Sequence, residues 1–247
     1  MVVREILAKA ILSKSQVFDY VLNAYVGCGH NCIYCYARFM KRFTRHYEPW
    51  GQFVDVKINA AGLLGREIRK KRKGTVWISG VCDAYQPLEK KYKLTRKCLA
   101  VLVEHGWPVV VQTKSPLVLR DLDILKKAAD CQVGFTVTTT DEKMRKIFEP
   151  GAPPIKKRIE ALEILHVEGI RTFVMVAPML PGAEGLSESL KGKVDHALID
   201  SYNYHYADQV YKKYRIQWAL EEEFFQQKSE ELRAAFEKAG ISCQILH

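Results

Sequence analysis

Short runs of β-branched and aromatic residues recur along the chain, separated by longer segments whose apolar residues fall three or four positions apart. The first pattern is typical of strands and the second of amphipathic helices. The predicted strands cover residues 20–26, 75–79, 108–113, 133–140, 171–178 and 194–199. Two of them contain the nearly continuous apolar sequences "VVVQT" and "TFVMVAP", which favour buried strands of a parallel sheet.

Helices are predicted between and after these strands, where the apolar spacing follows the helical period. They cover residues 92–105, 119–129, 155–168 and 222–238. Asp121 stands near the start of the second helix, where exposed amide groups favour a carboxylate. Gly169 and Gly240 follow the last two helices, in the position of a glycine that ends a helix.

Strands that alternate with helices of this length predict an α/β fold with parallel strands and right-handed crossovers. A chain of 247 residues can bury one substantial core, so we expect a single domain over residues 1–247. In such folds ligands bind beyond the carboxyl ends of the strands, so the polar strand ends are where we expect the chemistry.

Composition narrows the function classes. Hydrophobic residues make up 48% of the chain, a usual share for a globular protein, and no apolar run is long enough to span a membrane. The N-terminal sequence "MVVREILAKAILSKS" lacks the unbroken apolar segment of a signal peptide, so we expect a cytoplasmic protein with no membrane partner. A net charge of +10 favours an anionic partner such as nucleic acid, although many basic proteins bind none. In a reducing compartment, seven cysteines favour metal ligation or catalysis over disulfide bonds.

Three cysteines gather in the sequence "NAYVGCGHNCIYCYARF", at Cys28, Cys32 and Cys35. Thiolates at this spacing can bind a compact inorganic cluster from one loop, whereas a structural zinc ion normally needs four ligands. His30 could complete a zinc site on paper, but its place between two of the cysteines would strain the tetrahedron. Three ligands suit a four-iron cluster with one iron open, to which the amine and carboxylate of S-adenosyl-L-methionine could bind.

The Cys28-x3-Cys32-x2-Cys35 motif, with Tyr34 before its third cysteine, resembles the cluster-binding motif of the radical SAM superfamily. The blocks "GVCDAYQPLE", "QTKSPLVLRD", "GFTVTTTD", "FEPGAPPIKKRIEAL" and "VMVAPMLPG" resemble, in order, those of its spore photoproduct lyase branch. The resemblance covers about residues 23–182. It implies a partial (β/α)6 barrel with its core at about residues 18–202, followed by a short C-terminal helix and strand extension at about 203–247.

The resemblance also implies an enzyme. The three cysteines would bind a 4Fe-4S cluster, which a flavodoxin- or ferredoxin-like protein would reduce by one electron. The cluster would cleave S-adenosyl-L-methionine reductively to a 5′-deoxyadenosyl radical, which abstracts hydrogen from a substrate in a lyase-like or other radical reaction. A nucleic acid or nucleotide is one candidate substrate. The alternative is a non-catalytic iron-sulfur or zinc protein that binds nucleic acid.

Further cofactor-binding residues follow from matching positions in the lyase branch. Lys114 would contact the carboxylate of the cofactor, and we favour this role over that of a solvated loop cation, because a fixed ammonium group suits a carboxylate at the end of a strand. Gly80, Cys82 and Asp83 replace the usual glycine-glycine-glutamate turn, at the place where oxygens would meet the cofactor's ammonium group. Tyr34 is also expected to lie beside the cofactor.

Three other residues have two interpretations each. Thr136 and Ala177 match positions near the ribose or adenine of the cofactor, but ordinary core packing explains them as well. Arg158 is either a cation of the cofactor region or a structural anchor for the Glu149 carboxylate.

The sequence gives the fewest indications about the catalytic residues and the substrate. Cys82 matches a hydrogen-atom donor of the lyase branch, assisted by tyrosines such as Tyr34 and Tyr36, but it could be only a small buried thiol. The predicted walls of the radical site are Met179, Leu180 and Pro181. The similarity fades after Gly182, so a thymine-dimer lyase is not our first expectation.

Two segments could contact a nucleic acid. The tyrosines and cations of "DSYNYHYADQVYKKYR", residues 200–215, could stack bases and contact phosphates, or could simply cover the fold. The run "REIRKKRKG", residues 66–74, could bind phosphates or be a solvated helix end.

Overall fold

The structure is a computed structural model that describes residues 1–202 and 204–246. The contacts within the chain divide it into two compact units. Unit 1 comprises Met1–Asn31 and Ala37–Val133, and unit 2 comprises Cys32–Tyr36 and Gly134–His247. The expectation of a single domain over residues 1–247 stays a prediction.

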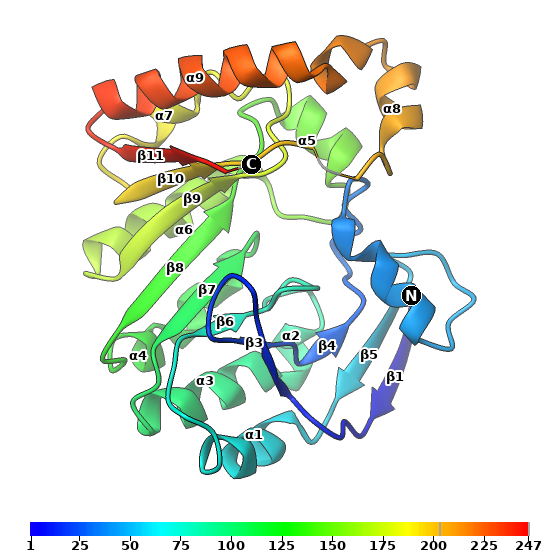
Figure 1. The fold of residues 1–247 in the computed structure, drawn as a ribbon, viewed down its shortest axis with the longest axis vertical. Coiled ribbons are helices and arrows are strands. Elements are labelled where there is room, and N and C mark those ends of the chain that lie inside the picture. Colours follow the sequence, from blue (N-terminus) through cyan, green and yellow to red (C-terminus); the bar gives the residue numbers. More distant parts are fainter. Residues whose placement is uncertain (203, 247) are drawn as a thin grey trace. The chain divides into compact units, whose positions relative to one another are not determined.

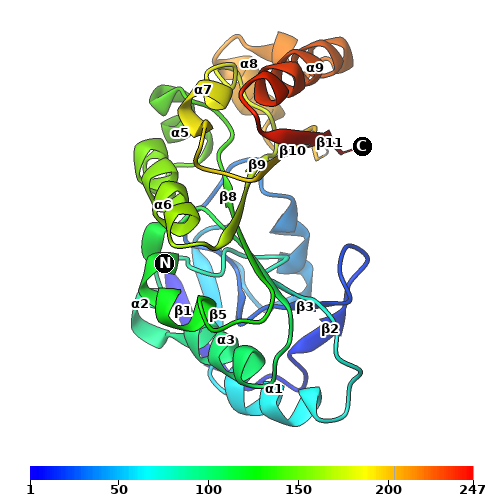
Figure 2. The same ribbon diagram turned by 90° about the vertical axis from the view of Figure 1, so that its left-hand side faces the viewer.

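Unit 1 contains two small sets of paired strands (Figures 1 and 2). Its strands are β1 (Val2–Ile6), β2 (Leu12–Lys14), β3 (Tyr20–Leu22), β4 (Tyr25–Val26), β5 (Phe53–Lys57), β6 (Val76–Ile78) and β7 (Val109–Thr113). Strand β5 pairs in parallel with β1 and antiparallel with β4. In the second set, β2 pairs antiparallel with β3, and β3, β6 and β7 follow in parallel order.

Helices of unit 1 connect these strands. They are α1 (Ala60–Ile68), α2 (Glu89–Tyr92), α3 (Leu94–Glu104) and α4 (Leu122–Leu125), with the 3-10 helices η1 (Tyr36–Phe43), which begins in unit 2, and η2 (Pro116–Asp121). Helices α1 and α3 pack against each other, and their buried leucines, such as Leu64 and Leu99, form part of the unit 1 core. Burial of such side chains is the main stabilising contribution to the unit.

The chain passes into unit 2 within β8 (Cys131–Thr136). The other strands of this unit are β9 (Arg171–Val176), β10 (His196–Ile199) and β11 (Ser242–Ile245), and β9, β10 and β11 pair in parallel. Its helices are α5 (Glu142–Phe148), α6 (Ile155–Val167), α7 (Leu186–Leu190), α8 (Asp208–Lys213) and α9 (Glu222–Lys238), with the 3-10 helix η3 (Gln217–Leu220). Helix α6 packs on β9, and α9 lies alongside β11 (Figures 1 and 2).

Most of the predicted elements are confirmed. Each predicted strand is present, although the run at 20–26 is divided into β3 and β4. The helices expected at 92–105, 155–168 and 222–238 correspond to α3, α6 and α9. Gly169 and Gly240 follow the last two with φ angles of +77° and +81°, the left-handed conformation of a helix-ending glycine.

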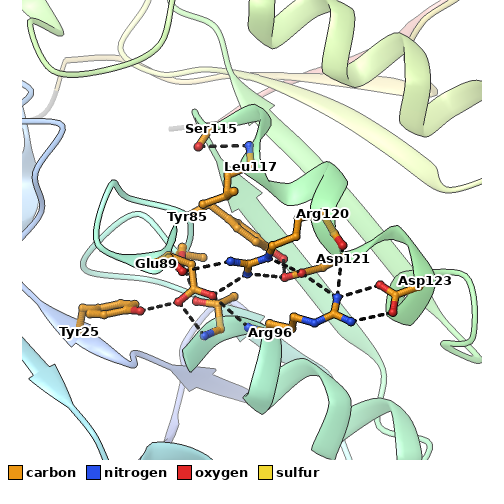
Figure 3. A network of polar contacts seen from close by, with 11 residues as sticks. Tyr25, Tyr85, Glu89, Arg96, Ser115, Leu117, Arg120, Asp121 and Asp123 are labelled. Carbon is orange, nitrogen blue, oxygen red and sulfur yellow. Dashed lines mark hydrogen bonds and ion pairs between the residues drawn. The ribbon is translucent and has the colours of Figure 1, made fainter. Parts of the chain in front are cut away.

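The prediction of one helix at 119–129 is wrong in its extent, because the segment forms η2 and then the short α4. The Asp121 side chain does not cap α4; Arg96, Arg120 and Tyr85 bind its carboxylate instead. The cap lies earlier, where the Ser115 hydroxyl accepts a hydrogen bond of 3.3 Å from the amide of residue 117 (Figure 3).

The structure therefore confirms an α/β fold with a parallel sheet, as expected of a partial barrel. Within the described residues the strand orders are open, and no pairing closes a barrel. A search of the same residues finds no helix with the length and hydrophobicity needed to cross a membrane.

Candidate functional site

The loop that carries Cys28 leaves β4 through a turn that only glycine fits. Gly27 has a φ angle of +89°, and a Cβ atom there would lie 2.3 Å from the carbonyl oxygen of Phe53. Cys28 itself is buried. The close approach to β5 therefore fixes the backbone just before the first cysteine.

Gln86 holds the same loop on both sides of Cys28. Its side-chain amide donates a hydrogen bond of 3.1 Å to the carbonyl of Gly27 and accepts one of 3.1 Å from the amide of Gly29. The Gln86 side chain is fully buried, so these two bonds do not compete with bulk water. Gln86 thus restrains the backbone of the first cysteine without contributing a charge.

His30, the residue considered as a fourth zinc ligand, is buried next to a carboxylate. Its Nδ1 lies 3.3 Å from an oxygen of Asp83. Asp83 also accepts hydrogen bonds of 2.6 Å from the Thr113 hydroxyl and 2.7 Å from the amide of Lys114. Burial acts to raise the pKa of Asp83, but His30 and these donors outweigh it and hold that pKa well below its ordinary value.

These contacts give Asp83 a second possible role. It was expected to meet the ammonium group of a cofactor, whereas its oxygens here join the His30 loop to the end of β7. The contact of Lys114 with a carboxylate stays a prediction, and its side chain is half-buried at that strand end. Gly80 is buried against Val21 and Trp77, so a larger residue would disturb this packing.

Cys82 faces the strand that leads into the cysteine loop. Its Sγ donates to the carbonyl of Tyr25 at 3.5 Å. Desolvation raises the pKa of Cys82 to about 11, so the thiol stays protonated at neutral pH. Nearby, Lys57 donates a hydrogen bond of 2.8 Å to the carbonyl of Asn23, and burial lowers its pKa.

A charged network lies beneath this region of unit 1 (Figure 3). The Tyr25 hydroxyl donates to the buried Glu89 carboxylate, which also forms a 2.7 Å ion pair with Arg120. Arg120 and Arg96 both pair with the buried Asp121, at 2.7 and 2.9 Å. The strand that precedes Cys28 is thus anchored through Tyr25 to a set of paired charges.

The other two cysteines belong to unit 2. Cys32 is buried and Cys35 is half-buried, and the amide of Cys35 donates to the carbonyl of Cys32 at 3.2 Å. Between them, the amide of Ile33 donates to the carbonyl of Phe148 at 2.8 Å. This bond ties the cysteine segment to the end of α5.

Tyr34 joins a buried ion pair. Its hydroxyl donates to the Glu149 carboxylate, which pairs with Arg158 at 2.6 Å and accepts a 3.1 Å hydrogen bond from Thr138. Burial and the neighbouring Glu149 raise the pKa of Tyr34 well above its ordinary value. Arg158 also donates to the carbonyl of Thr136 at 3.1 Å, and which of its two expected roles it has stays a prediction.

The remaining predicted residues of unit 2 are more dispersed. Thr136 is buried at the end of β8, and Ala177 is half-buried after β9, before a cis bond to Pro178. Tyr36 is exposed, and its ring stacks on Tyr204 with a centroid separation of 5.9 Å. The predicted contact residue Asn203 lies outside the described residues.

Two of the predicted walls border a cavity in unit 2. The cavity has a volume of about 220 Å³, and its lining contains both apolar and charged residues. Its lining residues are Met179, Leu180, Ala183, Glu184, Phe224, Lys228, Glu231, Leu232 and Ala235. Leu180 also packs in the buried cluster that contains Cys32 and Tyr34. One leucine thus connects the cavity to the cysteine segment.

The donor set itself fits an iron-sulfur cluster, because thiolates are the usual ligands of the iron atoms in such clusters. In the part of the chain that the structure describes, no group of three or more His, Cys, Asp or Glu side chains is arranged as a metal site. Cys28 belongs to unit 1, and Cys32 and Cys35 belong to unit 2, so neither unit alone contains the whole set.

Comparison with known proteins assigns the family. A family model described as the Radical SAM superfamily matches residues 22–184, which include all three cysteines and the cavity residues Met179 to Glu184. The chain belongs to the radical SAM superfamily. Members of this superfamily use S-adenosyl-L-methionine with an iron-sulfur cluster, and the match confirms the resemblance of the cysteine motif.

Related sequences come from distant organisms. An uncharacterised protein of Methanocaldococcus jannaschii is 41% identical over 162 residues, covering 66% of this chain and 61% of the relative. An uncharacterised protein of Mycobacterium tuberculosis is 32% identical over 199 residues, covering 75% of this chain and 58% of the relative. A radical SAM Nα-GlyT isomerase of Pseudomonas phage M6 is 24% identical over 156 residues, covering 63% and 32%. The chain thus spans about three fifths of the length of the first two relatives.

Solved structures share the fold of this radical SAM protein. Spore photoproduct lyase complexed with dinucleoside spore photoproduct matches with a TM-score of 0.73 and 14% identity, covering 98% of this chain and 81% of the lyase. Streptococcus suis SuiB bound to S-adenosylmethionine matches with a TM-score of 0.59 and 15% identity, covering 92% and 50%. At these identities the likeness shows the fold alone.

Gln86 and the pairing of His30 with Asp83 were not predicted as parts of the site. Both interactions join the cysteine loop to residues more than fifty positions later in the chain. The block "GVCDAYQPLE" contains Asp83 and Gln86, so the resemblance could have indicated them, but spacing within one segment could not.

Proposed function

We propose that this protein is a radical SAM enzyme in which Cys28, Cys32 and Cys35 hold a 4Fe-4S cluster. The observation that carries the proposal is this set of three cysteines within the region that the family model matches. When bound, the reduced cluster and S-adenosyl-L-methionine would supply a 5′-deoxyadenosyl radical that abstracts hydrogen from a substrate.

The chain's own residues would position the ligands. Gln86 and Gly27 hold the backbone around Cys28, and the Tyr34 interaction with Glu149 holds the segment between Cys32 and Cys35. A cluster ligand must keep its orientation through repeated reduction, and restrained backbones on both segments favour this.

We propose that S-adenosyl-L-methionine binds along the strand ends. Lys114 would pair with its carboxylate, because a cation at the end of a parallel strand suits that group. The residues proposed to surround the rest of the cofactor are Tyr34, Gly80, Cys82, Asp83, Thr136, Arg158 and Ala177. Among these residues, Arg158 would act indirectly, because its buried pair with Glu149 holds Tyr34 in place.

Cys82 is our proposed hydrogen donor. A donor must keep its hydrogen on sulfur, and the raised pKa of about 11 keeps the thiol protonated at neutral pH. Tyr36 would assist from the surface, where its ring stacks on Tyr204. In deuterated water, Cys82→Ala should change label incorporation into the product, and unchanged incorporation would reject the donor role.

For the substrate, we propose a nucleic acid or nucleotide, modified in a lyase-like or other radical reaction. The stacked rings of Tyr36, Tyr204 and Tyr206 support it, since bases stack on such rings. The cavity at Met179 and Leu180 would shield the reaction from water. We further propose a cytoplasmic location, where a flavodoxin- or ferredoxin-like protein would provide the electron.

The test uses anaerobically purified protein with dithionite and S-adenosyl-L-methionine, and measures 5′-deoxyadenosine by chromatography. We expect release from the wild type and from Cys131→Ala, a cysteine outside the motif. Cys32→Ala should bind little iron and release none. Protein that carries zinc without sulfide would support the non-catalytic alternative and contradict the proposal.

A further inference from the structure

The positive charge of the protein resides in one of its two units. Unit 1 contains 23 Lys and Arg against 11 Asp and Glu, a formal net charge of +12. Unit 2 contains 15 against 17, a net charge of −2. Whatever anionic partner the overall charge of +10 favours should therefore bind unit 1.

Six cations of unit 1 form what we call the basic surface. Its members are Lys14, Arg69, Lys70, Lys71, Arg72 and Lys73, and all six are exposed. Lys14 lies on β2, and the other five follow the end of α1. Two elements far apart in sequence thus supply one cluster of like charge.

Tyr20 holds the two elements together. Its hydroxyl donates a 3.0 Å hydrogen bond to the carbonyl of Arg72. The Nζ atoms of Lys14 and Lys71 lie 4.7 and 5.8 Å from the centre of its ring, within range of cation–π attraction. The ring therefore keeps two ammonium groups near each other although they repel.

The dipole of helix α1 does not explain why these cations are where they are. The dipole of α1 favours cations at the end of the helix, where Arg66 lies in the last turn and Arg69 is the C-cap residue. Lys71, Arg72 and Lys73 lie beyond that turn, and Lys14 belongs to a different element.

The cations of the basic surface form no ion pair with the acidic side chains that the structure describes. Among residues 1–202 and 204–246, none of the six cations lies within ion-pair distance of an acidic side chain. Arg96 and Arg120, in the same unit, are by contrast paired with buried carboxylates. The acids adjacent to the cation run, Glu67 and Asp19, accept hydrogen bonds from backbone amides, and the surface would therefore gain from an external anion.

The surroundings of the surface favour phosphate over a protein partner. Protein interfaces usually bury an apolar centre, whereas contacts to a nucleic-acid backbone need mainly cations. Within the two segments that carry these cations, residues 12–20 and 66–75, the exposed large apolar residue is Val17, in the β2–β3 turn. Exposed apolar side chains in this part of the unit are therefore too few for a protein interface.

We propose that the basic surface binds the phosphodiester backbone of a nucleic acid. Binding there neutralises phosphates, releases counterions and requires no particular base sequence. The surface includes none of the residues assigned to the cluster or to S-adenosyl-L-methionine, so binding goes beyond the proposed reaction and does not depend on it.

The test measures fluorescence anisotropy of a labelled 20-nucleotide single strand, and of the matching duplex, between 50 and 200 mM KCl. The full chain is used with its cluster but without S-adenosyl-L-methionine or reductant, so no turnover occurs. Six phosphate contacts to a single strand predict a slope of log affinity against log salt of about −4. A failure of the radical reaction would leave this result unchanged.

Two triple variants separate the basic surface from net charge. Lys70→Gln with Lys71→Gln and Lys73→Gln should make the slope about 2 units shallower and weaken binding about tenfold to a hundredfold at 100 mM KCl. Lys143→Gln with Lys146→Gln and Lys238→Gln removes three exposed cations of unit 2 and should change affinity less than about threefold. Circular dichroism checks that both variants fold.

Three outcomes would overturn the proposal. They are equal weakening by the two triple variants, absence of wild-type binding at 50 mM KCl, and binding to vesicles of phosphatidylserine and phosphatidylcholine without binding to either nucleic acid.

Discussion

The two units hold their cysteine segments by different physical means. In unit 1, the neutral amide of Gln86 bonds to the backbone on both sides of Cys28. In unit 2, Tyr34 is held by the fully buried charges of Glu149 and Arg158. A neutral amide costs little to bury when its bonds are made, whereas a buried charge depends strongly on its partner. The two segments should therefore respond unequally to loss of one side chain.

The largest effect is expected from Arg158→Met, which leaves the Glu149 carboxylate buried without its cation. Removing one partner of a buried ion pair costs about 3–5 kcal/mol of unfolding free energy. Urea unfolding followed by circular dichroism measures it. Arg171→Met, at an exposed arginine of β9, is the control and should cost less than about 0.5 kcal/mol.

A second variant sharpens this prediction. Adding Glu149→Gln to Arg158→Met removes the uncompensated charge, so part of the lost stability should return. If the double variant is no more stable than Arg158→Met alone, the buried charge is not what determines the stability of this segment.

Gln86→Leu should have the next largest effect. It leaves the Gly27 carbonyl and the half-buried Gly29 amide without their partner, at a cost near the lower end of about 1–3 kcal/mol each. Because these groups flank Cys28, the iron bound per chain after anaerobic reconstitution should fall. Gln52→Leu, at an exposed glutamine of unit 1, should keep its iron.

Gln86→Glu provides a conservative test of the same contact. A glutamate keeps an acceptor for the Gly29 amide but places a buried carboxylate against the Gly27 carbonyl, so iron binding should fall at least as far as in Gln86→Leu. Full iron content and unchanged stability in Gln86→Leu would show that the amide does not restrain the cysteine loop.

Tyr34→Phe should have a smaller effect, because the ring stays in the buried cluster and only the hydroxyl is removed. A hydrogen bond to a charged group contributes about 1.5–3 kcal/mol. Urea unfolding should therefore detect a loss in the lower part of that range. Tyr47→Phe, at a tyrosine that is 95% exposed, should be neutral; equal losses in both would contradict the role of Glu149 as the acceptor.

These residues also mark the limits of what the sequence could predict. Periodicity predicted α6 and α9 because their apolar residues contact a core directly. It did not predict β1, whose residues are mostly exposed, or α1, whose sequence "AAGLLGREI" contains two glycines. The spacing of apolar residues therefore predicts little where a strand is mostly exposed or where a helix contains residues that form helices weakly.

The proposed ligands of the site could be read from the sequence, but the residues that hold their backbone in place could not. Three cysteines close in sequence are visible as a motif, and the family match confirms the superfamily that they indicate. The partners of Tyr34 and Cys28 depend on Glu149 and Gln86, which the fold brings from distant positions. The sequence left two roles open for Arg158 for the same reason.

The smallest expected effect is the dependence of stability on pH that Cys82 causes. Because the folded pKa of Cys82, about 11, lies above the ordinary thiol value, its contribution to stability is present below that ordinary value and is lost as pH rises toward 11. Alkylation of Cys82, followed by peptide mass spectrometry, should have its midpoint near pH 11 in the folded protein. In urea the midpoint should fall to about 8.5. A midpoint near 8.5 in both states would contradict a desolvated thiol.

The most direct measurement is the electron paramagnetic resonance spectrum of the dithionite-reduced protein before and after addition of S-adenosyl-L-methionine. If three cysteines leave one iron open, the wild-type signal of a reduced 4Fe-4S cluster should change on addition, as should that of Cys131→Ala. An iron-sulfur signal that stays the same at saturating S-adenosyl-L-methionine would mean that the fourth position is closed, and would contradict the proposed enzyme.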